Sequence, residues 1–406
     1  MKFLKLILIT ATLLPINVFA DYWTQKADFG GINRADATGF AIGTKGYIGT
    51  GFTTTYSQDW WEYDQATNTW VQKANYGGSG IVEAAAFSVG SKGYILPAPI
   101  GNDLWQYDSQ LDTWTQMAVF PGSARQAAVA FSIDTKGYIT TGLSSTLGGS
   151  LNDLWEYDIP SNMWTQKSDL TGPARHYATG FAIGTKGYVG TGISTATSYL
   201  NDFWAWDRIT DTWSQQASFP GAARVEASGF ALNGMGYIGM GSANGNYYTD
   251  FYQYNPNTNT WAQKADFLGG PREEATQFAI GSFGYVGTGY AGITAGVMKK
   301  DFWEYHPEDS TTSLQDLNSA SMNLKVYPNP FSTETQISLD LIPTGQEINL
   351  QIFDMMGKIV YSQSVSNKTT IIQRGNLADG VYQMYLTAQG KVIGEEKIIV
   401  SGKSNY

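Results

Sequence analysis

Hydrophobic and polar residues alternate in short runs along most of the chain, and the runs recur with a long period. Residues 81–90, 93–96, 103–108 and 113–117 show one period of four runs. The runs are short and aromatic-rich, and tight Gly or Asn/Asp turns separate many of them, which is typical of β-strands. The pattern therefore predicts an all-β protein built from four-stranded units.

A tryptophan marks the fourth strand of each unit, and successive copies lie 44 to 50 residues apart. The copies are Trp23, Trp70, Trp114, Trp164, Trp213 and Trp261. A Gly-Tyr pair also recurs six times, as does an Asp followed two positions later by an aromatic residue. Four short strands repeated every 40–50 residues predict the blades of a β-propeller.

The motif set resembles kelch repeats, the family that also includes galactose oxidase-like propellers. The matching features are an Arg before the first strand, the Gly-Tyr of the second, and the segment YDQATNTW at residues 63–70. The kelch double glycine is replaced by Gly-Thr-Gly at residues 49–51, and the second unit reads Leu-Pro-Ala-Pro at 96–99. The resemblance covers residues 21–306 and implies a fold rather than a function.

The two ends of the repeat region complement each other. No Trp-bearing fourth strand follows Tyr305, whereas an extra copy stands at the beginning, around Trp23. We therefore expect the N-terminal strand to complete the last blade, which gives six blades without an unpaired edge at the closure.

The first twenty residues predict a secretory signal peptide. Lys2 and Lys5 precede an apolar run that ends in Val18-Phe19-Ala20, which favours cleavage before Asp21. The run is about a dozen residues, too short to span a bilayer. We expect no membrane span in the mature chain.

The last hundred residues differ in composition from the repeats. Residues 307–323 are polar and free of aromatic residues, which indicates a linker, and short alternating strands in 324–406 predict a small immunoglobulin-like β-sandwich. A generic module of that fold is the alternative to the reading that follows.

This segment resembles the type A C-terminal sorting domain of the type IX secretion system of Bacteroidota. The resemblance rests on Val-Tyr-Pro-Asn-Pro at 326–330, on residues 352–358 and 377–382, and on a closing strand at 396–400. It implies that residues 324–406 engage the type IX machinery. The protein would then be secreted or carried on the outer surface of a Gram-negative bacterium.

Composition excludes several kinds of chemistry. The chain has no Cys, which rules out thiolate metal sites and the Cys–Tyr cross-link of the copper oxidases related to galactose oxidase. It has two His, and its net charge of −10 argues against nucleic acid. We predict no cofactor, no metal and no catalytic residue.

The candidate binding face carries a ring of arginines and acids. In an antiparallel blade, the loops joining second to third strands share one face with the junctions between blades, and here these loops vary in length. The junctions hold Arg in five units and Ile81 in the second, with several acids two residues later. The candidate ligand-binding residues are Arg34, Asp36, Glu83, Arg125, Arg175, His176, Tyr177, Arg224, Glu226, Arg272 and Glu274.

Two interpretations of this ring stay open. Arg forks at the channel mouth would suit a polar or anionic ligand such as an acidic sugar. Alternatively, each Arg is a structural clamp that hydrogen-bonds carbonyl groups or pairs with an acid of the next blade. The leading functional hypothesis is a non-catalytic module that binds a glycan or a protein. The other is a cofactor-independent sugar epimerase or mutarotase, with Arg224 and Glu226 or Arg272 and Glu274 at the channel mouth.

Overall fold

The computed structural model describes residues 21–98, 101–144, 146–194, 197–292, 296–307, 324–339, 348–354, 359–388 and 391–402. The predicted signal peptide, Pro99, all of the predicted linker except its first residue, and residues 355–358 lie outside these ranges. The chain divides into two compact units, one ending at Glu308 and the other beginning at Asp309. Throughout the described residues the regular elements are β-strands.

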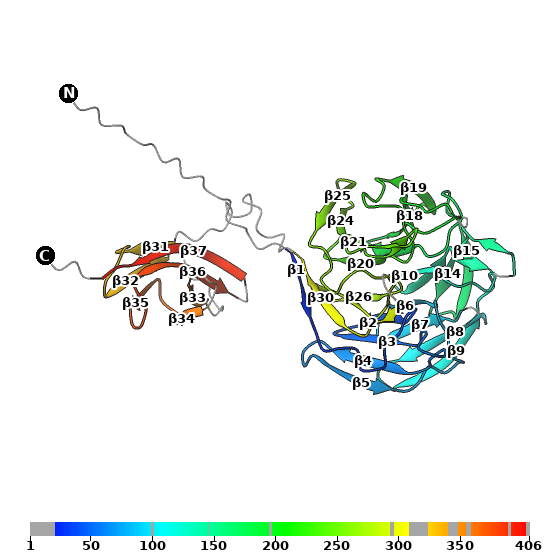
Figure 1. Ribbon diagram of the computed structural model, residues 1–406, viewed down its shortest axis with the longest axis horizontal. Coiled ribbons are helices and arrows are strands. Elements are labelled where there is room, and N and C mark those ends of the chain that lie inside the picture. Colours follow the sequence, from blue (N-terminus) through cyan, green and yellow to red (C-terminus); the bar gives the residue numbers. More distant parts are fainter. Residues whose placement is uncertain are drawn as a thin grey trace, which may run out of the picture. The chain divides into compact units, whose positions relative to one another are not determined.

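The first unit is a six-bladed β-propeller, as the sequence predicted. Each blade is a four-stranded antiparallel sheet, and Figure 1 shows β2, β6, β10, β20 and β26 near the centre with β5, β9, β15, β19 and β25 at the rim. Blade one consists of β2 (Thr38–Ile42), β3 (Lys45–Gly49), β4 (Trp60–Asp64) and β5 (Thr69–Lys73). Blade two consists of β6 (Ala85–Val89), β7 (Lys92–Leu96), β8 (Asp103–Asp108) and β9 (Thr113–Val119). Blade three consists of β10 (Val129–Ile133), β11 (Lys136–Thr140), β14 (Leu154–Asp158) and β15 (Met163–Lys167).

The remaining blades repeat this order, and the last one draws on both ends of the unit. Blade four consists of β16 (Thr179–Ile183), β17 (Lys186–Gly190), β18 (Phe203–Asp207) and β19 (Thr212–Gln216). Blade five consists of β20 (Ser228–Leu232), β21 (Met235–Gly239), β24 (Phe251–Asn255) and β25 (Thr260–Lys264). Blade six consists of β26 (Thr276–Ile280), β27 (Phe283–Gly287), β30 (Phe302–His306) and β1 (Tyr22–Gln25). β1 pairs antiparallel with β30, with Trp23 opposite Tyr305.

The repeated aspartate or asparagine two residues before each outer-strand Trp joins neighbouring blades. Asn68 adopts a left-handed backbone, with φ of +54°, which Asn and Asp tolerate better than most residues. Its Oδ1 accepts hydrogen bonds from the hydroxyl of Tyr63 at 3.0 Å and from the backbone N–H of Ala27 at 2.9 Å. Trp70 then donates its indole N–H to the carbonyl of Ala27 at 3.1 Å. The segment YDQATNTW therefore supplies the hydrogen bonds that join one blade to the next.

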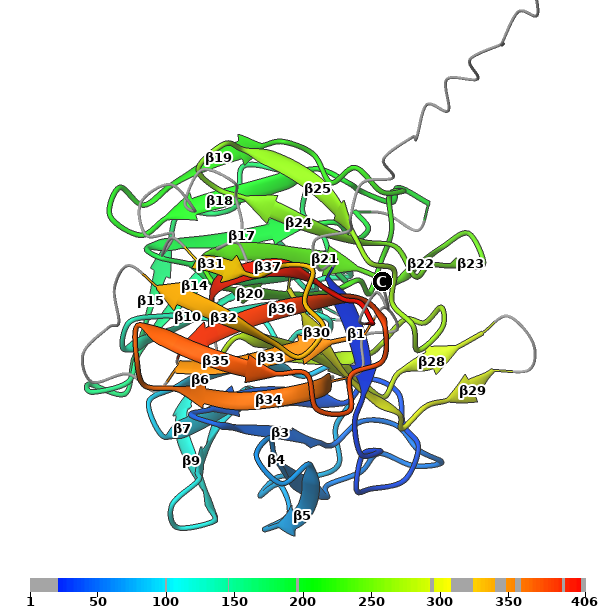
Figure 2. The same ribbon diagram turned by 90° about the vertical axis from the view of Figure 1, so that its left-hand side faces the viewer.

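Extra hairpins lie on the face where the blades are joined to one another. They are β12 (Leu143–Ser144) with β13 (Gly149–Ser150), β22 (Ser242–Ala243) with β23 (Asn246–Tyr247), and β28 (Tyr290–Ala291) with β29 (Val297–Met298). Figure 2 shows the last two pairs projecting on the same side of the propeller. Bridges between inter-blade junctions and these loops, such as Val225 with Ser242 and Glu273 with Tyr290, place both on one face.

The second unit is a two-sheet sandwich. One sheet consists of β31 (Leu324–Tyr327), β32 (Glu334–Leu339) and β35 (Thr369–Gln373). The other consists of β34 (Ile359–Val365), β33 (Ile348–Phe353), β36 (Gly380–Ala388) and β37 (Lys391–Val400), and its strands are labelled in Figure 2. Alternate residues of both sheets, including Ile337, Leu350 and Met384, are fully buried in one common core. Asn329 of the Tyr-Pro-Asn-Pro motif binds the backbone of β37 through both side-chain polar atoms, at 2.7 Å and 2.8 Å.

Candidate functional site

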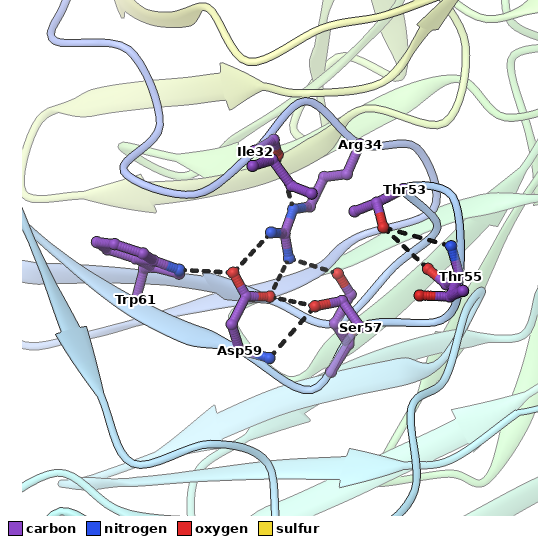
Figure 3. Close-up of polar contacts among 8 residues, drawn as sticks. Ile32, Arg34, Thr53, Thr55, Ser57, Asp59 and Trp61 are labelled. Atoms are coloured by element: carbon purple, nitrogen blue, oxygen red, sulfur yellow. Dashed lines mark hydrogen bonds and ion pairs between the residues drawn. The ribbon is translucent and has the colours of Figure 1, made fainter.

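An Arg–Asp clamp stands at the junction before the first blade. Arg34 binds Asp59 in a bidentate pair, Nη1 to Oδ1 at 2.6 Å and Nη2 to Oδ2 at 2.7 Å (Figure 3). Its Nη1 also donates to the carbonyl of Thr50 and its Nε to that of Ile32. Trp61 donates its indole N–H to the same carboxylate at 2.7 Å. The guanidinium is thus held on several sides by acceptors.

The same clamp recurs in four more blades. The further pairs are Arg125–Asp153, Arg175–Asp202, Arg224–Asp250 and Arg272–Asp301. All five Arg residues are between 0 and 3 % exposed. Burial by itself would raise the pKa of the partner carboxyls, but the hydrogen bonds from Arg outweigh it and lower the pKa of Asp59, Asp153, Asp202 and Asp301. This is the structural clamp that the sequence left open, except that the acid comes from the same blade as its Arg rather than from the next one. The buried guanidinium groups offer no surface to a ligand.

The channel mouth is instead formed by one equivalent residue from each blade. These six residues have left-handed backbones, with φ between +52° and +58°: Asp36, Glu83, Ala127, Tyr177, Glu226 and Glu274. Each directly precedes an alanine that lines a channel of about 140 Å³, to which every blade contributes at least one residue at or just before its first strand. We call these six residues the mouth ring.

Backbone hydrogen bonds connect successive members of the mouth ring. Glu83 donates its N–H to the carbonyl of Asp36 at 3.3 Å, and Ala127 donates to Glu83 at 3.1 Å. Tyr177 donates to Ala127 at 3.1 Å, and Glu226 to Tyr177 at 2.9 Å. These four hydrogen bonds join the mouth-ring backbones of blades one to five.

The carboxyl groups of the mouth ring are held in a poorly solvated, negatively charged place. Burial, with repulsion from Glu83 and Glu273, raises the pKa of Asp36 to about 7. Burial, with repulsion from Asp36, Glu273 and Glu83, raises the pKa of Glu274 to about 9. Burial likewise raises the pKa of Glu226 and of Glu83. Near neutral pH the mouth ring therefore holds protons, and it offers hydroxyl donors as well as carboxylate acceptors.

Tyr177 and His176 sit differently although they are neighbours in sequence. The Tyr177 hydroxyl donates to Oε1 of Glu83 at 2.9 Å, and so links blade four to blade two past the small side chain of Ala127. His176 lies within 2.9 Å of the Ser150 hydroxyl through Nδ1, and burial lowers its pKa. His176 therefore belongs to the loop layer, and Tyr177 belongs to the mouth ring.

Glu273 is a member of this site that sequence reasoning missed. Ser242 donates its hydroxyl to Glu273, and burial together with a hydrogen bond to Glu273 raises the pKa of Tyr247 to about 12. The carboxylates of Glu226, Glu273 and Glu274 come within 4.8 Å of one another. That spacing allows shared protons, and it is one at which carboxylates could also hold a hard cation. The adjacent pair Glu273-Glu274 beside Arg272 was the available sequence signal.

Comparison with known families matches the two units separately. Residues 98–289 match the family model described as KLHDC2/KLHL20/DRC7 Kelch-repeats domain, and residues 325–401 match the Secretion system C-terminal sorting domain. The chain is a kelch-repeat propeller with a C-terminal sorting domain. A solved structure titled "Structure of YjhT" has a TM-score of 0.59 and 14 % identity, covering 68 % of this chain and 96 % of that chain. At that identity the likeness shows the fold alone. A search of curated protein sequences gives no match.

The sorting domain indicates where the kelch protein is located. It directs export by type IX secretion to the cell surface or outside, which implies interaction with the type IX machinery. Within the described residues, the kelch protein has no helix with the length and apolar character needed to cross a bilayer.

Proposed function

We propose that the kelch propeller is an extracellular, non-catalytic binding module for a neutral, hydroxyl-rich glycan at the mouth ring. The observation that supports this proposal is the set of mouth-ring carboxyl groups with raised pKa. Each belongs to a residue that directly precedes an alanine of the channel lining. Partly protonated carboxyls both donate and accept hydrogen bonds, which matches sugar hydroxyls. Because the five Arg side chains are already paired with Asp residues, they would not bind an acidic sugar, which would instead meet the carboxyl groups of the mouth ring.

The irregular loops support the same location. They stand on the face of the mouth ring, and Tyr247 brings an aromatic side chain into hydrogen-bond contact with Glu273, the neighbour of Glu274. Aromatic rings beside polar groups suit the mixed apolar and polar faces of a sugar. A protein partner is the other class of ligand that we expect this face to accept.

A second candidate function is cofactor-independent sugar epimerisation or mutarotation. One observation favours it: burial and carboxylate repulsion raise the pKa of Asp36 to about 7. A general acid or base works best when its pKa lies near the working pH. Glu274, with its pKa raised to about 9, would be the paired proton donor.

Export adds a proposal about processing. We infer that the precursor is cleaved before Asp21 and that a Bacteroidota-type host carries the product outside its outer membrane. β1 begins at Tyr22, the second residue after that cleavage point, which supports it. N-terminal sequencing of the secreted protein would test the cleavage point.

Two measurements test the functional proposal. A glycan array probed with the secreted chain should show binding that Glu226→Gln and Glu274→Gln weaken at least about ten-fold. Lys186→Ala is the control, because this side chain is 44 % exposed at the start of β17, next to the β16–β17 turn on the opposite face. A proton-exchange measurement by NMR on free reducing sugars separates the enzyme: faster anomer exchange that is lost in Asp36→Asn would replace the binding proposal with mutarotation.

A further inference from the structure

Blade two lacks the Arg–Asp clamp found in every other blade. The Asp at the start of its third strand is present, but the Arg is not. Ile81 occupies the Arg position, and it is 4 % exposed. Asp103 is equivalent to Asp59, and in the part of the chain that the structure describes it has no ion-pair partner. A cavity of about 360 Å³ opens at this place, lined by Ile81, Asp103 and Trp105 among others.

The cavity keeps the acceptors that a guanidinium uses elsewhere in the same propeller. In blade one, Arg34 donates to the carbonyls of Thr50 and Ile32 and to Asp59. The equivalent residues of blade two are Pro97, Ser79 and Asp103, and all three line the cavity. In the five other blades, the equivalent acceptors bind the guanidinium group of an Arg.

Blade two also keeps the aromatic ring that packs against the guanidinium in blade one. Arg34 lies over the ring of Phe29, with 4.6 Å between its guanidinium carbon and the ring centroid. Tyr76 takes the Phe29 position and packs edge-on against Trp105 at 5.7 Å, as Phe29 does against Trp61 at 6.1 Å. A cation in the cavity would thus meet an aromatic face beside a carboxylate.

An unsatisfied hydroxyl points to a missing ligand. Tyr76 is 3 % exposed, it lines the cavity, and its buried hydroxyl has no hydrogen-bond partner among the residues that the structure describes. A buried polar group without a partner is destabilising, so a ligand that hydrogen-bonds to it removes an existing penalty. Burial and the Asp103 carboxylate raise the pKa of Tyr76, so the phenol stays neutral and can accept from a cation.

Access to the cavity is from solvent. Tyr56 on its rim is 52 % exposed, and Asp103 and Trp105 are half-buried rather than closed off. The Tyr76 hydroxyl lies beside Gly78 much as Nη2 of Arg34 lies beside Gly31.

We propose that this cavity in blade two is a binding site for a guanidinium group supplied from outside the chain, as an arginine side chain or a free guanidinium compound. The guanidinium would pair with Asp103, donate to the Ser79 and Pro97 carbonyls and the Tyr76 hydroxyl, and stack beside the Tyr76 ring. This site is separate from the mouth ring and does not depend on the function proposed there.

Calorimetric titration of the secreted chain tests the site with three probes: N-acetyl-arginine amide, methylguanidinium and N-acetyl-lysine amide. We expect the first two to bind and the lysine probe to bind at least about ten-fold more weakly, because an ammonium cannot form the bidentate pair. Tighter binding of the arginine probe than of methylguanidinium identifies a peptide side chain as the source, and the reverse identifies a small compound. No binding of either guanidinium probe, or equal binding of lysine, would overturn the proposal.

Two variants make the test specific. Asp103→Asn should weaken guanidinium binding at least about ten-fold, whereas Asp169→Asn, at an exposed carboxyl, should leave it unchanged. Ile81→Arg rebuilds the clamp within the chain and should abolish binding while raising the melting temperature. If Ile81→Arg does not fold, Asp103→Asn still decides, and undiminished binding by that variant refutes the site.

Discussion

The carboxylate of Asp21 accepts a 2.8 Å hydrogen bond from the hydroxyl of Tyr305, 284 residues later in the chain. Asp21 also accepts the backbone N–H of Ala265, and Trp23 donates its indole N–H to the carbonyl of the same residue at 3.1 Å. Asn68 and Trp70 make this pair of contacts with Ala27 within the continuous repeat. The seam of the propeller is therefore held by the same contacts as the other blade junctions.

This seam predicts a large loss of stability when its aromatic anchor is removed. Trp23 is 4 % exposed and packs against Phe251 and Phe267. Replacing a buried aromatic residue by Ala costs about 3–5 kcal/mol, so Trp23→Ala should lower the free energy of unfolding by that amount in urea denaturation. Leu111→Ala, at a residue that is 70 % exposed, serves as the control. An unchanged unfolding midpoint for Trp23→Ala would contradict closure by β1.

The clamps predict that arginine substitutions act on stability. Arg224 is fully buried and paired with Asp250, and removing one partner of a buried pair costs about 3–5 kcal/mol. Arg224→Ala should therefore melt at a clearly lower temperature in calorimetry, while Lys186→Ala melts like the unaltered protein. A normal melting temperature combined with loss of glycan binding would instead restore Arg224 as a ligand-binding residue.

The mouth ring predicts stability that declines as pH rises. A carboxyl whose pKa is higher in the folded state than in the unfolded chain stabilises the fold fully below the unfolded value, and this stability is lost as pH rises through the folded value. For Asp36 and Glu274 the window runs from about 4 to about 9. Glu274→Gln should leave stability at pH 4 nearly unchanged and raise it at pH 9, measured by urea unfolding. Asp169→Asn should show no such difference, and an equal effect of Glu274→Gln at both pH values would argue against a raised pKa.

The sorting domain predicts where a truncated chain accumulates. The propeller and the sandwich are separate compact units, so removal of residues 324–406 should leave a folded propeller. In a host with type IX secretion, cell fractionation should find this propeller inside the outer membrane and the full chain outside it. A version carrying only Tyr327→Ala, at an 81 % exposed side chain, keeps the domain intact for comparison. Export of the truncated chain at the normal level would contradict the role of the domain.

The sequence by itself determined the blades, their number and the sorting domain. Each of the first five blades is encoded within about 50 residues: period-two alternation sets the strands, and the motif at 63–70 contains both the turn and the inter-blade contact. These motifs occur six times, so each copy supports the strand assignment of the others. The departure of blade two, with Ile81 in place of Arg, was also visible there.

Only the tertiary structure decided what those residues do. The Arg side chains looked like a ring for ligands because sequence places them at the mouth, yet each meets an Asp 25 to 29 residues later and is buried against it. The raised pKa values of Asp36 and Glu274 arise because the closed ring gathers acids from different blades, and the Tyr177–Glu83 hydrogen bond joins residues 94 positions apart. Desolvation and charge repulsion depend on which side chains converge in space, and chain order alone does not specify that convergence.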